Sequence, residues 1–85
     1  MIINICGITL NEWWDYGFAL YRISSTSNGH FIQISASSRK YKIICYGKIS
    51  VLNKLFENVE FFTQNEAKEY VDNLLIKYDS LKAFI

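Results

Sequence analysis

The sequence contains no proline, one histidine, two cysteines and four glycines among its 85 residues. Without proline, a polyproline ligand segment or a proline-rich linker within this chain is excluded. One histidine and two distant cysteines do not supply ligands at the spacing of a zinc site, and we expect no cofactor. Two cysteines are also too few for the disulfide framework of a small secreted protein. We therefore expect Cys6 and Cys45 to be buried thiols, with a disulfide or a redox pair as the alternative.

Long apolar runs are absent as well. The longest run has only a few residues, whereas a membrane-spanning helix needs about 20. The N-terminal residues lack the basic region that begins a signal peptide. Hydrophobic residues make up 51% and charged residues 20% of the chain, which is typical of a globular protein. We therefore expect one domain spanning residues 1–85, in the cytoplasm of the producing cell or of a host, with no membrane partner.

Catalytic motifs are missing too. The sequence has no nucleophile elbow, no H-E-x-x-H zinc motif, no P-loop and no glycine-rich dinucleotide motif. The carboxylates of the last expected helix fall on its solvated face, and nothing suggests an acid–base pair in a cleft. We therefore expect that the protein is not an enzyme.

The clearest structural signal is a helix start at Thr63. Thr63 and Glu66 have the spacing of a capping box, in which the hydroxyl accepts from a backbone N–H three residues later and the carboxylate reaches back. Apolar residues then recur at steps of three and four, which predicts one apolar stripe on a helix of about 20 residues. The stripe comprises Ala67, Tyr70, Val71, Leu74, Leu75, Tyr78, Leu81 and Ile85.

Two hairpins are predicted before this helix. Asn28-Gly29 is a strong signal for a two-residue type I′ turn, which sets Ile23 opposite Ile34. A second turn at residues 37–40 sets Ile34 opposite Ile43. The inner, apolar face then comprises Ala19, Tyr21, Ile23, Ile32, Ile34, Ala36, Tyr41, Ile43 and Cys45. The outer face comprises Leu20, Arg22, Phe31, Gln33, Lys42, Ile44 and Tyr46.

Shorter elements complete the expected fold. Residues 2–6 form a strand, and residues 10–16 form either a short helix that stops at Gly17 or an extended segment. Ser50 caps a short helix that runs to Phe56. The fold class is therefore α+β: an antiparallel meander of three strands, or four, packed on a long C-terminal helix, with one or two short extra helices.

Charge is distributed unevenly along the chain. Residues 39–54 contain five basic residues and no acid, whereas residues 55–85 contain six acids and three lysines. The acidic end predicts a protein-binding surface that imitates phosphate charge, made of Glu57, Glu60, Glu66, Glu69 and Asp72. The alternative is a nucleic-acid surface on the outer sheet face, made of Arg22, Phe31, Arg39, Lys40, Lys42 and Tyr46. A segment containing Trp13 and Trp14 that folds over this face and buries it is a third interpretation.

Three short strands followed by residues 62–68, Phe-Thr-Gln-Asn-Glu-Ala-Lys, resemble the arm-type DNA-binding domain of phage-type integrases, whose strands are more basic. The layout of residues 18–80 also resembles small binding proteins of phages and mobile elements, anti-CRISPR proteins among them. That resemblance implies an inhibitor or adaptor that acts on a protein partner, such as a nucleic-acid-handling complex. The alternative is a nucleic-acid-binding domain, and a homodimer is compatible with either.

Overall fold

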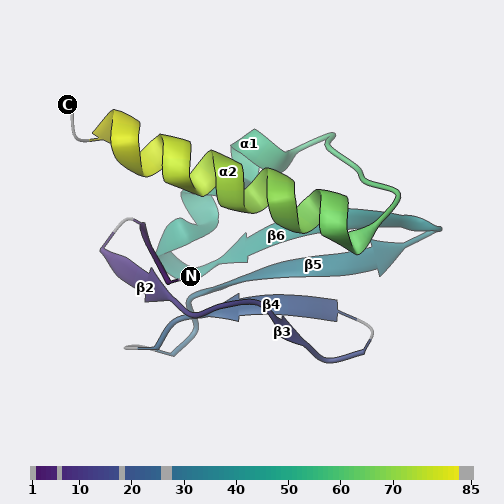
Figure 1. The fold of residues 1–85 in the computed structure, drawn as a ribbon, viewed down its shortest axis with the longest axis horizontal. Helices are drawn as coiled ribbons and strands as arrows, with labels where there is room; N and C mark the ends of the chain where they lie inside the picture. The colour runs from purple at the N-terminus through teal and green to yellow at the C-terminus, as the bar shows by residue number, and fades with distance from the viewer. Residues whose placement is uncertain (1, 6, 18, 26–27, 83–85) are drawn as a thin grey trace.

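A computed structural model describes residues 2–5, 7–17, 19–25 and 28–82, with side chains described as far as Lys77. It has the expected α+β fold, in which one long helix lies against one face of an antiparallel sheet (Figure 1). The strands are β1 (Ile3–Ile5), β2 (Ile8–Leu10), β3 (Trp14–Asp15), β4 (Ala19–Ile23), β5 (Phe31–Ser37) and β6 (Lys40–Tyr46). The helices are the 3₁₀ helix η1 (Gly47–Leu52), α1 (Asn53–Phe56) and α2 (Gln64–Lys82).

The main sheet has four antiparallel strands in the order β3-β4-β5-β6, and β1 and β2 form a separate hairpin. The expected short helix over residues 10–16 is wrong, and the extended alternative is confirmed. The Asn11 N–H donates to the Ile23 carbonyl at 2.9 Å, and Trp14 pairs with Tyr21. The backbone groups that a helix would use are therefore bonded to β4 instead.

A β-bulge interrupts this pairing beside β4. Leu10 is bridged to Ser24, and Trp14 pairs with Tyr21. Three residues (11–13) therefore span the same interval as two residues of β4 (22 and 23). The extra residue reverses the alternation of side chains, so that Trp14 faces away from α2 although Leu10 faces the core.

The predicted β5–β6 register is confirmed, with Ile34 opposite Ile43. The turn between these strands is formed by Ser38 and Arg39, whose φ angles are 49° and 68°. Two successive residues with positive φ match a type I′ turn, which fits the twist of the flanking strands.

The predicted β4–β5 register is wrong by three residues, since Ile23 pairs with Phe31 and not with Ile34. Asn28-Gly29 lies inside a longer connection, and only Gly29 of the two has a positive φ, so it is not a two-residue type I′ turn. A shift by an odd number exchanges the two faces of β4. Leu20 and Arg22 therefore face α2, and Tyr21 and Ile23 face outward.

The core lies between the main sheet, the β1–β2 hairpin and α2. The predicted stripe on α2 is confirmed for Ala67, Val71 and Leu75, whereas Tyr70 is 37% exposed; Tyr78, Leu81 and Ile85 lie outside the described side chains. The Glu66 N–H donates to Thr63 Oγ1 at 3.1 Å, which confirms the hydroxyl half of the predicted capping box. The core residues are Ile3, Ile5, Ile8, Leu10, Leu20, Ile32, Ile34, Ile43, Cys45, Ile49, Leu52, Phe56, Ala67, Val71 and Leu75.

The short helical segment before α2 begins earlier than expected, at Gly47 rather than at Ser50. Neither η1 nor α1 has a hydrogen bond from a capping side chain. In the part of the chain that is described, no helix combines the length and the apolar character needed to cross a membrane.

Candidate functional site

The outer side of the four-stranded sheet, opposite α2, carries a row of aromatic side chains. We call Trp14, Tyr16, Tyr21, Phe31 and Tyr46 the aromatic face. Successive ring centres are separated by 6.3, 5.2, 5.7 and 4.4 Å, in that order. The row crosses from β3 to β6, because Trp14 is paired with Tyr21 and Phe31 with Tyr46 in the strand register.

The rings are held in place by side-chain hydrogen bonds as well as by contact. Gln33 Nε2 donates to the Tyr21 hydroxyl at 2.9 Å, and the Tyr46 hydroxyl donates to Gln33 Oε1 at 3.1 Å. Phe31 and Tyr46 are stacked with an interplanar angle of 22°. Gln33 thus links the Tyr21 and Tyr46 rings, and side chains held in this way lose less entropy when a partner binds.

The aromatic face is open to solvent. Trp14 is 63%, Tyr16 50% and Tyr46 36% exposed, and Ile23 and Ile44 beside them are 38% and 37% exposed. Contiguous apolar surface of this kind marks a binding site more often than single exposed residues do.

The interpretation in which Trp13 and Trp14 together bury this face is wrong. The bulge directs Trp13 to the opposite side of the sheet, where it is half-buried against the core. Trp14 becomes part of the aromatic face instead of covering it.

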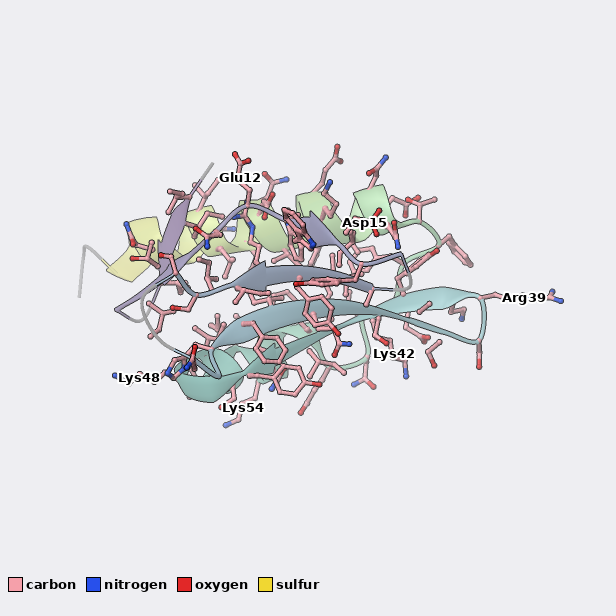
Figure 2. All side chains as sticks on the ribbon, turned by 90° about the horizontal axis from the view of Figure 1, so that it is seen from below. Glu12, Asp15, Arg39, Lys42, Lys48 and Lys54 are labelled. Carbon is pink, nitrogen blue, oxygen red and sulfur yellow. The ribbon has the colours of Figure 1, made fainter. Side chains whose placement is uncertain are left out.

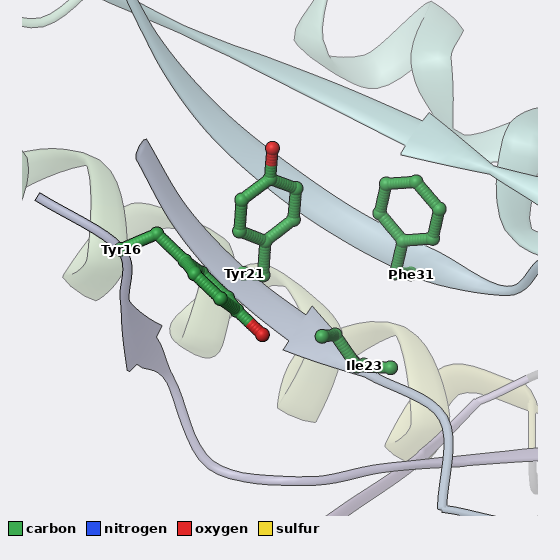
Figure 3. Close-up of a pocket in the computed structure, with 4 residues that line it drawn as sticks. All are labelled: Tyr16, Tyr21, Ile23 and Phe31. Carbon is green, nitrogen blue, oxygen red and sulfur yellow. The ribbon is translucent and has the colours of Figure 1, made fainter. Parts of the chain in front are cut away.

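A hollow of about 290 Å³ lies within the aromatic face, lined by Tyr16, Tyr21, Ile23 and Phe31 (Figure 3). Figure 3 shows the rings of Tyr21 and Phe31 face-on and the ring of Tyr16 edge-on. An adjoining hollow of about 240 Å³ shares three of these residues and is lined in addition by Asn11, Glu12 and Trp14.

The charged residues labelled in Figure 2 are separated in space. The labelled basic residues lie along one long side of the molecule and at the tip of the β5–β6 hairpin, and the labelled acidic residues lie on the other side. The labelled basic residues are Lys42, Lys48, Lys54 and Arg39, and the labelled acidic ones are Glu12 and Asp15.

Arg22 does not belong to an outer nucleic-acid surface, because its side chain is 2% exposed and faces α2. Its Nε donates to Asp72 Oδ1 at 3.0 Å, and its Nη1 donates to the Asn11 carbonyl at 2.7 Å. The guanidinium carbon lies 5.4 Å from the ring centre of Trp13, whose Nε1 donates to Asp72 Oδ1 at 2.9 Å. Asp72 is therefore not a freely accessible acid of a docking surface; it holds α2 to β4.

The other predicted acids lie in two places. Glu57 and Glu60 lie between α1 and α2, and Glu66 and Glu69 lie in the first turns of α2; all four are exposed. Glu60 Oε1 is 4.0 Å from Lys40 Nζ. Lys40 was predicted to belong to the nucleic-acid surface, and it thus lies next to Glu60, which was predicted to belong to the protein-binding surface.

The remaining members of the predicted nucleic-acid surface are partly brought together. Phe31, Tyr46 and Lys42 lie on the outer side of neighbouring strands. Arg39 is exposed at the tip of the hairpin.

Cys45 is a structural thiol. It is 2% exposed, and this burial raises its pKa to about 12. Its N–H donates to Asn53 Oδ1 at 2.7 Å, and its carbonyl accepts from Asn53 Nδ2 at 2.9 Å, so a side chain completes this edge of β6. Cys6 lies outside the described residues, so the distance between Cys6 and Cys45 is not described either.

Comparison with protein-family models, with curated proteins and with solved structures finds no match. The function therefore has to be argued from the geometry of the aromatic face. Among the described residues, no three histidine, cysteine or acidic side chains are grouped as metal ligands.

The sequence predicted only Phe31 and Tyr46 of the aromatic face. Tyr21 was assigned to the inner face by the register error, and Trp14 and Tyr16 were not assigned to the sheet surface. The available signal was their spacing of two residues, which puts both on one face if residues 14–16 are extended.

Proposed function

We propose that this protein is a non-catalytic binding protein, an inhibitor or adaptor, which docks a protein partner on the aromatic face. The observation that carries the proposal is the continuous row of five solvent-accessible rings. Tyrosine, tryptophan and phenylalanine are enriched in the buried centres of protein interfaces, where a few such residues supply most of the binding energy. Blocking or bridging a partner requires this kind of preformed surface and no catalytic group.

We place the binding surface on the aromatic face and not on the predicted acidic residues of α2 and of the segment before it. Asp72 is engaged with Arg22 and Trp13, and Glu60 is close to Lys40. Glu66 and Glu69 remain exposed and serve as the matched comparison for a test.

The test is quantitative capture of partners from an extract of the organism that encodes the chain. A Trp14→Ser/Tyr16→Ser variant removes two exposed rings, and a Glu66→Gln/Glu69→Gln variant removes two exposed charges from α2. We expect a specific partner of the wild-type protein to be lost with the first variant and retained with the second. The reverse result would refute the aromatic face as the docking surface.

A nucleic-acid partner is the second candidate, favoured by the position of Lys42 on the same side of the sheet as Phe31 and Tyr46. Bases would stack on the rings and phosphates would approach the basic side. This function predicts oligonucleotide binding that weakens steeply between 50 mM and 200 mM salt, measured by fluorescence anisotropy. No binding at the lower salt concentration would exclude it.

A further inference from the structure

The outer edge of β6 is paired by two different devices. β6 is the last strand on its side of the four-stranded sheet, and α1 packs beside it (Figure 1). Tyr41 exchanges two backbone hydrogen bonds with Phe61, at 2.8 and 3.0 Å. Cys45 instead bonds through its N–H and its carbonyl to the side-chain carboxamide of Asn53, at 2.7 and 2.9 Å. A carboxamide therefore takes the place of a neighbouring strand at this position.

Ile43 lies midway between these two paired positions. Backbone groups alternate in direction along an antiparallel strand, so the N–H and the carbonyl of Ile43 point to the same edge as those of Tyr41 and Cys45. Neither group has a hydrogen-bond partner among the described residues. Ile43 is only 6% exposed, and backbone polar groups at such positions normally have a partner. The edge thus presents one donor and one acceptor side by side.

Ile43 lines a hollow of about 350 Å³ between β6, α1 and the chain that follows α1. This volume lies in the range of small-molecule pockets, about 300–1,000 Å³. Its apolar lining comes from Ile44, Phe56 and Val59. A lysine and two glutamates also line it; they are exposed and carry charge of both signs, which does not favour a strongly charged ligand. None of the described residues that line this hollow belongs to the aromatic face.

We propose that this hollow binds a small molecule that carries a primary carboxamide on an apolar ring. A primary carboxamide holds a donor and an acceptor side by side, which match the carbonyl and the N–H of Ile43. The chain shows the same pairing two residues away, between Asn53 and Cys45. The ring of the ligand contacts Phe56 and Val59. The inference goes beyond the proposed function, because it concerns a second site with a different ligand.

The backbone groups of Ile43 also exclude other occupants. A carboxylate offers acceptors and no donor, so it would leave the Ile43 carbonyl unpaired. A partner strand needs several consecutive free positions along an edge. Phe61 and Asn53 occupy the positions on either side of Ile43, so an extended chain along β6 would collide with both. The free interval admits a single group.

The test is a titration of the full chain with benzamide, followed by the ¹H–¹⁵N NMR signal of the Ile43 N–H. The matched probe is N-methylbenzamide, whose trans amide places a methyl group where the hydrogen beside the carbonyl oxygen would be. We expect benzamide to shift the Ile43 signal saturably, with a dissociation constant of about 10 mM or lower for a ligand of this size. N-methylbenzamide should bind roughly twofold to tenfold more weakly, because it leaves the Ile43 carbonyl unpaired. Equal affinities, or no saturable shift of this signal up to about 50 mM benzamide, would overturn the proposal.

Two variants locate the site. Val59→Trp places a large ring in the lining of the hollow and should abolish the shift that benzamide causes at Ile43. Val51→Trp is the control, because Val51 is 62% exposed on η1 and is not among the residues that line the hollow. The same affinity for benzamide in both variants would contradict the assignment to this hollow. If Val59→Trp does not fold, the two ligands titrated on the wild-type chain decide the matter.

N-acetylglutamine N-methylamide is titrated in parallel, because it carries the same group on a peptide side chain. We expect it to bind more weakly than benzamide, since it lacks the ring that contacts Phe56 and Val59. If it shifts the Ile43 signal at lower concentration than benzamide, the carboxamide belongs to a side chain of a protein partner, and the small-molecule ligand is wrong.

Discussion

Replacing Asp72 by alanine is expected to destabilise the fold by about 3 kcal/mol. Arg22 is 2% exposed, and its Nε relies on Asp72 Oδ1 at 3.0 Å. The same oxygen accepts from Trp13 Nε1 at 2.9 Å. Alanine would remove the Asp72 carboxylate from a buried guanidinium and the acceptor from the Trp13 indole N–H.

The magnitude follows from the burial of the two partners. Removing one partner of a fully buried ion pair costs about 3–5 kcal/mol. The Asp72 side chain is 24% exposed, so water can replace part of its interaction, and the lower end of that range applies. For a domain of this size, about 3 kcal/mol lowers Tm by roughly 12–24 °C.

The measurement is urea unfolding followed by far-ultraviolet circular dichroism. Asn73→Ala is the matched control, because Asn73 is the next residue on α2 and is exposed. A double variant, Arg22→Met/Asp72→Leu, should recover most of the lost stability, since it removes both charges and retains apolar volume. A loss below about 1 kcal/mol for Asp72→Ala, which is the range of exposed pairs, would refute this reasoning.

Four further outcomes are expected. In a Cys6→Ser background, Cys45 should react with iodoacetamide at pH 8 roughly a thousandfold more slowly when folded than when unfolded, because burial raises its pKa from 9.0 to about 12. For the same reason the free energy of unfolding should fall as pH rises from 9 to 12, where the unfolded thiol loses its proton and the folded thiol keeps it; a flat profile in that window would contradict this. Ser38→Asn/Arg39→Gly should stabilise the protein by about 1 kcal/mol in urea unfolding, because these residues tolerate the φ angles of 49° and 68° better, and no gain would argue against a strained turn. Gly47→Ala should lower Tm clearly, because the added Cβ would overlap the ring of His30 and because Gly47 has a φ of +80°, which alanine rarely adopts. An unchanged Tm would show that this contact relaxes freely.

The parts of the fold that were predictable from sequence are those fixed by local chemistry. The cap at Thr63 and the stripe of Ala67, Val71 and Leu75 follow from short-range patterns, and all are found. The β5–β6 register was also predicted correctly, because the apolar residues of both strands and the short turn agree on it.

The β4–β5 register could not be obtained in this way. Asn28-Gly29 marks a turn, but a two-residue signal does not reveal how long the connection around it is. The true register also places Arg22 in the core, which an apolar pattern disfavours, because arginine is rarely buried without a partner. That partner is Asp72, 50 residues away in the sequence, and no local pattern connects the two.

The bulge beside β4 joins the stability of the fold to the candidate site. The one extra residue in the interval 11–13 sends Trp13 inward, where its ring meets Arg22 and its N–H meets Asp72. The same residue sends Trp14 outward, next to Tyr16. With regular alternation from Leu10, the two tryptophans would exchange sides, and Tyr16 would turn inward together with Trp14. The buried guanidinium would then lose its contact with Trp13, and the row of rings would end at Tyr21. One backbone irregularity therefore makes the buried ion pair tolerable and extends the binding surface, which is why the sequence motif Trp13-Trp14 serves two different purposes on the two faces of one sheet.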